Sequence, residues 1–282
     1  MRGSGNGTLT SRGLAMTNEQ IKQLLLSIET CQCDFSVTMT GKSSPRVNGL
    51  YKPETHEILL HNKNFKNDNA LVYTAIHEYT HHLLTADAEK SGIRTTGRQK
   101  AHDTKFWARM DGLVEKAVEK GLYKRNRSEK LTALIEEAKQ IDHEIAALRK
   151  KLGIILQKIH QVTDEEGTRF EDVLTHDIRM QKSTAEKCFN ASLVDQDDIG
   201  QDVQEVLSKT VKKSSAVKEA AKNAVAKDKT VEQLKMEIQL QSDKSRESSP
   251  RARLEKERSR LEKTISALQQ RLSIVCETIE SM

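Results

Sequence analysis

The apolar and polar positions follow a helical period at first. From Thr17 onward, apolar side chains recur every three or four residues, as at Ile21, Leu24 and Ile28. This spacing places them on one face of a helix, which Thr17 or Asn18 can cap. The sequence therefore predicts an amphipathic helix that begins near residue 17.

Between residues 34 and 66 the period shortens to two. Alternating or short apolar runs occupy 35–39, 47–51 and 56–60, and turn-forming residues separate them. Runs of this length and period are typical of short β-strands. We expect a small antiparallel sheet of three strands.

The next helical stretch carries the candidate chemistry. Residues 75–84, AIHEYTHHLL, read H-E-x-x-H within an apolar run that has no Pro or Gly. On a helix, positions i and i+4 lie on one face, so His77 and His81 point to a common position. Two neutral imidazoles there suit Zn²⁺, and Glu78 can take a proton from a water that the metal activates. The pattern indicates metal-assisted peptide hydrolysis.

An ordinary helix with two surface histidines is the alternative interpretation. Apolar residues flank the motif on both sides, from Leu71 to Leu84, as in a buried helix. The ring nitrogens of a buried histidine without a ligand need other polar partners. We therefore expect a metal-binding helix from about residue 70 to residue 85, capped by residues 67–69.

Zinc in catalytic sites usually has three protein ligands, so a third is sought downstream. Asp87 fits poorly, because Leu84 favours continuation of the helix where a turn is needed. Glu89 is a carboxylate alternative near the expected helix end. His102 is the better candidate, since it opens a second amphipathic helix after a polar loop. The inward face of that helix is expected to hold Phe106, Met110, Leu113, Ala117 and Val118.

The combination of H-E-x-x-H with a downstream H-x-x-x-F-W resembles the SprT-like zinc metallopeptidases and their WLM-type and YgjP-type relatives. In those families the three histidines bind zinc and the glutamate is the catalytic base. The resemblance implies that His77, His81 and His102 bind zinc in this chain and that Glu78 is the base. It covers roughly residues 17–120, under half of the chain.

The resemblance extends upstream of the metal-binding helix. Residues 47–51 and 58–61 look like the strands that precede this helix in SprT-like proteins. In the zincin relatives the sheet flanks the cleft, and its edge strand pairs with an extended peptide. This comparison makes the last strand, Glu57 to His61, the candidate edge.

Three residues beside the motifs are expected to have no direct part in the chemistry. Phe106 and Trp107 are interpreted as core anchors that fix the second helix, rather than as substrate contacts. His82 follows a ligand directly, and adjacent residues on a helix point about 100° apart. We expect His82 to lie outside the metal site.

Beyond residue 126 the period becomes a heptad. Apolar residues between 131 and 162 alternate spacings of three and four without interruption, which predicts a coiled coil. A second apolar row of this kind occupies 254–279. The two rows can pair as an antiparallel hairpin, or each can pair with another copy, and the sequence leaves both possibilities open.

These periods predict an α+β fold: a small zincin-like domain, with a three-stranded antiparallel sheet packed on helices, and a long α-helical coiled-coil tail. The segments follow from the changes of period and composition. They are a flexible tail at 1–16, a SprT-like zinc metallopeptidase domain at 17–125, a coiled coil at 126–180, short helices and a linker with few apolar positions at 181–250, and a second coiled coil at 251–282.

Composition supports long solvated helices. Charged residues make up 31% of the chain and aromatic residues only 4%, which does not suit one large core. No run approaches the roughly 20 apolar residues of a membrane helix, and residues 1–16 lack the apolar stretch of a secretory signal. We therefore expect a cytoplasmic protein without a membrane partner.

The net charge of +5 is concentrated in the N-terminal part. Residues 1–125 hold 18 Lys and Arg against 13 Asp and Glu, which leaves 28 against 28 in the remainder. A nucleic-acid partner such as DNA and an ordinary solvated surface explain this excess equally well.

Four cysteines are present, and they form no pair of C-x-x-C motifs. This excludes a zinc ribbon of the kind that some SprT-type proteins carry, and it puts ribbon-mediated DNA contact in doubt. Cys31 and Cys33 are interpreted as ordinary thiols.

Together these features predict a zinc metalloendopeptidase that acts on protein substrates and uses its coiled coils for self-association or partner binding. The alternative is a coiled-coil scaffold, or a DNA-associated protein, with a non-catalytic metallopeptidase-like domain. Glu78 beside three candidate ligands favours the enzyme, since a scaffold has no need of a catalytic base.

Overall fold

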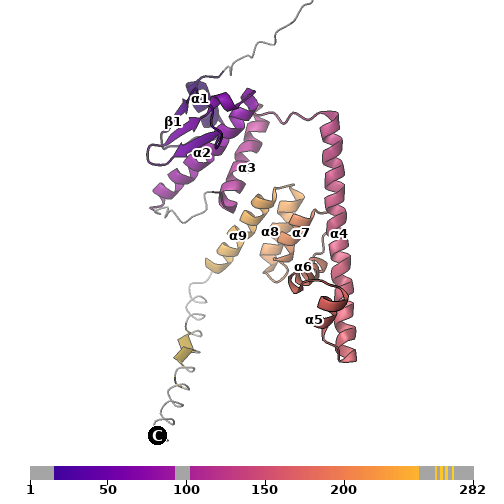
Figure 1. Cartoon of the computed structure of the whole chain (residues 1–282). Coiled ribbons are helices and arrows are strands. Elements are labelled where there is room, and N and C mark those ends of the chain that lie inside the picture. The colour runs from indigo at the N-terminus through magenta and orange to yellow at the C-terminus, as the bar shows by residue number, and fades with distance from the viewer. Residues whose placement is uncertain are drawn as a thin grey trace, which may run out of the picture.

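The computed structural model describes residues 16–92 and 102–247, together with 258, 261, 262, 264, 265 and 269. An N-terminal group of three helices and a small sheet is followed by the long helix α4 (Glu129–Glu166) and a group of shorter helices (Figure 1). The α+β class is confirmed at this level. No helix among the described residues combines the length and the apolar character that a membrane span requires. The tail predicted at 1–16 and the coiled coil predicted at 251–282 lie almost entirely outside the described residues.

The sheet is mixed rather than antiparallel. Strands β1 (Ser36–Met39), β2 (Gly49–Lys52) and β3 (Glu57–Leu60) have the order β1-β3-β2. β3 pairs antiparallel with β2 but parallel with β1. A tight turn makes β2 and β3 a hairpin, and this hairpin inserts β3 between the other two strands. The prediction of an all-antiparallel sheet is wrong because β1 meets β3 instead of its neighbour in sequence.

The insertion of β3 also changes which strand is the edge. Because β3 is paired on both sides, the prediction that residues 57–61 form the edge strand is wrong. The edges are β1 and β2. The Asn48 carbonyl accepts a hydrogen bond from the His61 N–H at 2.9 Å, so the alternation of an antiparallel ladder turns the main-chain groups of Gly49 and Tyr51 away from β3.

Helix α2 (Asp68–Lys90) carries the H-E-x-x-H motif and is longer than predicted at both ends. Asn67 caps it, since the Asn67 side-chain oxygen accepts a hydrogen bond from the Ala70 N–H at 2.9 Å. The apolar face of α2 packs against the sheet and two other helices. Its largest buried apolar side chains are Leu71, Val72, Ile76, Tyr79 and Leu83.

Two further helices complete this core. Helix α1 (Asn18–Ile28) begins as predicted, with a capping box in which Thr17 and Gln20 exchange hydrogen bonds. Helix α3 (Thr104–Glu119) begins where Asp103 accepts a hydrogen bond from the Phe106 N–H at 2.9 Å. The buried face of α3 holds Phe106, Met110, Leu113, Val114 and Ala117, so Val114 replaces the predicted Val118.

The C-terminal helices form a packed group with cores of their own. Their bounds are α5 (Phe170–Asp172), α6 (Lys182–Ser192), α7 (Gln201–Ser208), α8 (Ser215–Ala226) and α9 (Val231–Glu247). Helix α6 crosses α4 at Gly153, where a Cβ atom would lie 2.0 Å from the Cys188 carbonyl oxygen. α7, α8 and α9 share a second core around Leu207, Ala221 and Leu234. The short helices expected at 181–250 are present. α9 continues as far as Glu247, into the part of this segment where the sequence suggested a linker.

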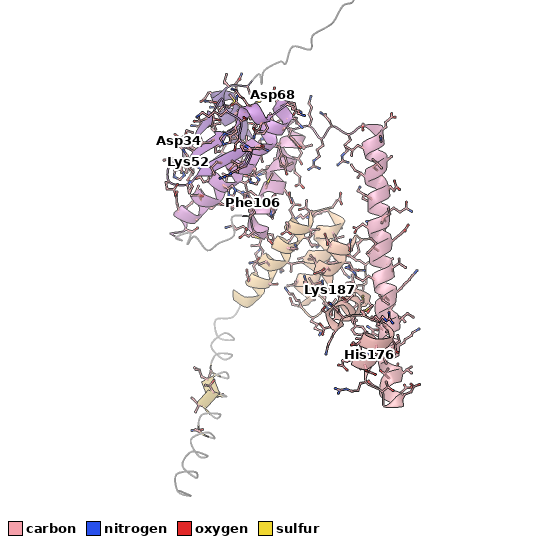
Figure 2. All side chains as sticks on the ribbon, in the orientation of Figure 1. Asp34, Lys52, Asp68, Phe106, His176 and Lys187 are labelled. Atoms are coloured by element: carbon pink, nitrogen blue, oxygen red, sulfur yellow. The ribbon has the colours of Figure 1, made fainter. Side chains whose placement is uncertain are left out.

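The predicted heptad face of α4 is exposed. Leu148 is 61% exposed, whereas Leu156 on another face is fully buried against the shorter helices. Figure 2 shows the side chains of α4 along its whole length, and the heptad positions Leu134, Ile141 and Leu148 are all exposed. The helix ends at Glu166, with Gly167 as its cap, short of the predicted residue 180. Coiled-coil pairing of this face stays a prediction.

Helix α9 returns to the N-terminal domain and packs along α3 (Figure 1). The Thr230 hydroxyl donates a hydrogen bond to Asp111 at 2.5 Å, and the Gln233 amide donates one to Glu115 at 3.2 Å. The tail thus contacts the helix that begins beside the candidate metal site.

Candidate metal centre

Two helices bring the three predicted ligand histidines together. His77 and His81 lie one turn apart on α2, with ring centroids 5.3 Å apart. His102 stands immediately before Asp103, the N-cap of α3, and its ring faces α2. The His102 Nε2 atom lies 2.9 Å from Nε2 of His77 and 3.1 Å from Nε2 of His81.

Hydrogen bonding between neutral rings cannot account for both contacts of His102. A ring nitrogen carries either one hydrogen or one lone pair, so the single Nε2 of His102 can serve only one of its two neighbours. All three nitrogens nevertheless point to one position, and their ligand atoms lie within 4.8 Å of one another. A cation at that position satisfies three lone pairs at once.

Aromatic rings support this cluster on its inner side. The Phe106 ring centroid lies 4.9, 4.4 and 4.6 Å from those of His77, His81 and His102. Phe106 is buried, so its interpretation as a core anchor is confirmed. Trp107 is 36% exposed and lies 5.6 Å from the His102 ring. The interpretation of Trp107 as a core anchor is therefore wrong, because this ring lies at the surface beside the site.

The surroundings keep the two α2 imidazoles neutral. Burial lowers the pKa of His77 to about 4, with a smaller contribution from the neighbouring His102. Burial likewise lowers the pKa of His81 to about 4, with smaller contributions from the two other histidines. Neutral imidazoles have the free lone pair that a metal ligand needs.

Glu78 is buried between α2 and β2. Its side chain is 6% exposed, and burial raises its pKa to about 7 although a hydrogen bond from the Tyr51 N–H opposes the shift. A Cβ atom at Gly49 would lie 2.9 Å from the Glu78 carboxylate. A carboxyl group with a pKa near neutrality can both accept and return a proton.

The other candidates lie away from the three imidazoles. Asp87 is exposed, and Glu89 lies beside Cys33 and His56 instead. His82 is outside the metal site, as expected, but it is buried and hydrogen-bonded to Tyr51 and to the Cys33 carbonyl.

Sequence reasoning missed the contributions of Gly49 and Tyr51. The signal for Gly49 was present, because an isolated glycine in a strand marks close approach of another group. Nothing in the pattern identified the Tyr51 N–H as the partner of Glu78.

The donor set fits zinc. Three neutral imidazoles are a common zinc ligand set, and they leave a fourth position for water or substrate. The Phe106 ring beneath the cluster helps to fix the orientation of the three imidazoles. The chain matches no family model, curated protein or solved structure in the comparisons made, so its chemistry is inferred from its own residues.

Proposed function

We propose that this chain is a zinc metallopeptidase that hydrolyses peptide bonds in protein substrates, similar to the SprT-like enzymes. The observation that carries the proposal is the convergence of three imidazole nitrogens, with His102 Nε2 at 2.9 and 3.1 Å from the other two. When bound there, zinc polarises the scissile carbonyl and activates the attacking water.

Glu78 is the general base and then the general acid. Its carboxylate takes a proton from the attacking water and returns it to the leaving amine. The hydrogen bond from the Tyr51 N–H holds one side of the carboxyl group, and the absence of a side chain at Gly49 makes room for it. Burial excludes bulk water and raises the pKa of Glu78 to about 7, which suits both proton transfers.

The substrate peptide lies in an extended conformation along the outer edge of β2. The Gly49 main-chain groups and the Tyr51 carbonyl face away from β3 and can pair with a peptide, while the Tyr51 N–H holds Glu78. Leu50, whose side chain is exposed, and the exposed ring of Trp107 offer apolar contacts for substrate side chains. The proposed peptide-binding edge is therefore β2, beside Glu78, rather than residues 57–61.

A scaffold function is the second candidate, and the exposed heptad face of α4 favours it. Apolar side chains such as Leu134, Ile141 and Leu148 lie uncovered on this face, and rows of this kind pair with other helices. In a pure scaffold the metal has a structural role and Glu78 has no chemical one.

Cleavage of an unfolded protein such as casein separates the two functions. Zinc-loaded wild type, Glu78→Gln and Glu54→Gln are compared, since Glu54 is an exposed glutamate in the β2–β3 turn. We expect equal zinc in all three and cleavage by wild type and Glu54→Gln only. Equal cleavage by Glu78→Gln, or no cleavage by wild type with zinc bound, contradicts the proposal. Addition of DNA to the same assay tests whether a nucleic acid stimulates cleavage, and rising salt must weaken any phosphate contact.

A further inference from the structure

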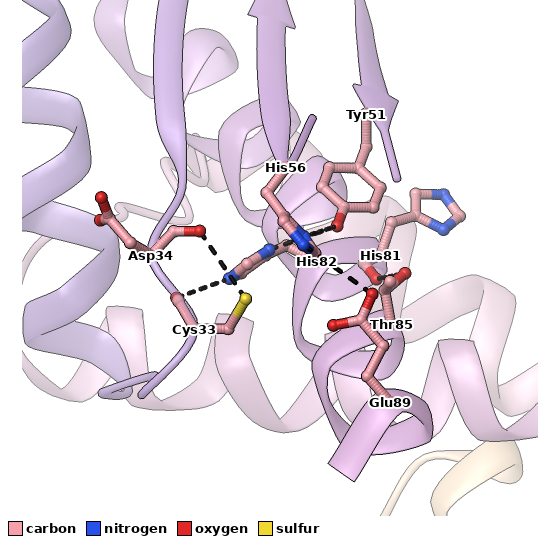
Figure 3. Close-up of polar contacts among 8 residues, drawn as sticks. All are labelled: Cys33, Asp34, Tyr51, His56, His81, His82, Thr85 and Glu89. Atoms are coloured by element: carbon pink, nitrogen blue, oxygen red, sulfur yellow. Dashed lines mark hydrogen bonds and ion pairs between the residues drawn. The ribbon is translucent and has the colours of Figure 1, made fainter. Parts of the chain in front are cut away.

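A second group of metal-ligand side chains lies near the C-terminal end of α2. Cys33, His56 and Glu89 each place one ligand atom within 4.8 Å of the others (Figure 3). Cys33 precedes β1, His56 lies in the turn between β2 and β3, and Glu89 lies in the last turn of α2. His56 Nε2 and the Glu89 carboxylate are 3.8 Å apart. Ligand atoms of a tetrahedral zinc site lie about 3.3–3.8 Å apart, given its bond lengths.

A chain of hydrogen bonds fixes which nitrogen of His56 faces this group. His82 Nε2 lies 3.2 Å from the Cys33 carbonyl oxygen, and because a carbonyl only accepts, this nitrogen is the donor. In the neutral ring the other nitrogen, Nδ1, carries the lone pair. Nδ1 therefore accepts the hydrogen of the Tyr51 hydroxyl at 3.3 Å.

The Tyr51 hydroxyl has then used its only hydrogen. Its oxygen lies 2.9 Å from His56 Nδ1, so it accepts the Nδ1–H of His56. This leaves a lone pair on His56 Nε2, the nitrogen that faces Glu89. A ligand histidine in metalloproteins usually donates its other ring N–H to an oxygen in the same way.

The charges of the cluster point to a cation. Burial raises the pKa of the Cys33 thiol, and the negative charges of Cys31, Glu89 and Asp34 raise it further. Burial raises the pKa of Tyr51 to about 12, with smaller contributions from Cys33, Glu89 and Cys31. The Glu89 carboxylate and the lone pair on His56 Nε2 repel each other, and the Cys33 sulfur offers a third electron pair beside them. A divalent cation can accept all three electron pairs.

We propose that Cys33, His56 and Glu89 bind a second divalent metal ion of the zinc class, which ties the C-terminal end of α2 to the sheet. The site differs from the three-histidine site, because Glu89 follows His81 by eight positions, about 12 Å along the helix axis at 1.5 Å per residue. Its role is structural: it joins three segments around the helix that carries the motif. The proposal does not depend on peptidase activity.

Cobalt binding distinguishes this site by its sulfur ligand. A Cys thiolate bound to Co²⁺ gives charge-transfer absorption in the near ultraviolet, whereas a site of three imidazoles lacks this band. The full chain is stripped with a chelator and titrated with Co²⁺ alone. Wild type has two proposed sites, so we expect it to show the band and to bind two Co²⁺ per chain. In His102→Ala, which removes a ligand of the other site, we expect the band to saturate at one Co²⁺ per chain.

Substitutions assign the band to its ligands. Cys33→Ser removes the band, while Glu89→Gln, at an exposed position compatible with folding, weakens Co²⁺ binding at least tenfold. Cys31→Ser and Cys188→Ser are the matched thiol controls and retain the band. Absence of the band from wild type overturns the proposal. So does a band that persists in Cys33→Ser, is lost in Cys31→Ser, or forms with unchanged affinity in Glu89→Gln.

Discussion

Gly49 and Glu78 are in direct contact, and a Cβ atom at Gly49 would lie 2.9 Å from both Cγ and Oε1 of Glu78. A real side chain there displaces the carboxyl group from its place beside β2. We expect Gly49→Ala to lower the cleavage rate by about tenfold or more, because a displaced base loses part of the 10²–10⁴-fold that general-base catalysis supplies. Zinc content is expected to stay the same, since the atoms nearest a Cβ at Gly49 belong to Glu78 and Thr74 rather than to the three histidines.

Gly112→Ala is the matched control for that substitution. Gly112 lies within α3, and a Cβ atom there meets nothing within 4 Å. We expect full activity and a gain in stability of about 0.5–1 kcal/mol, because alanine favours the helix. Equal losses of activity in both glycine variants contradict the direct contact between Gly49 and the base.

The buried carboxyl group of Glu78 predicts a pH-dependent effect on stability. Its pKa rises from 4.5 to about 7 on folding, so the folded chain binds more protons between these values and loses stability as the pH rises through them. In metal-free protein, Glu78→Gln is therefore expected to raise the free energy of unfolding by about 1–3 kcal/mol above pH 7. Urea denaturation at about pH 4, where both side chains are neutral, is expected to show little difference.

The ligand histidines predict the opposite pH dependence. The pKa of His77 and His81 falls to about 4 in the folded chain, below the ordinary value of 6.5. Their contribution to stability is complete above pH 6.5 and is lost as the pH falls towards 4. Metal-free wild type is expected to lose more stability between pH 7 and 5 than a double variant with Gln at both positions, as measured by urea midpoints. Equal losses of stability in wild type and in the double variant mean that the two imidazoles are not buried in solution.

Two leucines on α4 test the orientation of this helix. Leu156 is fully buried, whereas Leu148 on the heptad face is 61% exposed. Leu156→Ala is expected to cost about 2–5 kcal/mol of stability, and Leu148→Ala less than about 0.5 kcal/mol. If Leu148→Ala lowers stability as much as Leu156→Ala does, and the loss depends on protein concentration, another chain covers the heptad face instead.

Local patterns predicted the elements that position the candidate site. The capping box at Thr17, the helical spacing around His77 and the start of α3 after His102 depend on nearby residues, so the sequence contained them. The proximity of His102 to the other two histidines followed only from a resemblance and from the number of ligands that zinc requires, since no local rule joins residues on separate helices.

The strand order, the buried face of α4 and the Cys33 cluster depend on long-range packing, so local sequence patterns did not predict them. The position of β3 between β1 and β2 depends on the hairpin and on the packing of both strands, and not on the alternation of any one strand. The apolar heptad positions of α4 predicted a buried face, yet small residues at Gly153 and Ala146 allow α6 and α7 to pack on another face. The Cys33 cluster joins residues of three segments that are distant in sequence, which is why Cys33 resembled an ordinary thiol in the sequence.

Zinc content is the most direct test of the three-histidine site. It is measured on purified full chain in a Cys33→Ser background, so that the second proposed site does not contribute, with His102 intact or replaced by Ala. We expect one zinc per chain with His102 intact and a loss of most of that zinc in His102→Ala, because two imidazoles alone bind the ion weakly. Equal zinc in the two proteins, or none in either, contradicts the convergence of His77, His81 and His102 on one metal ion.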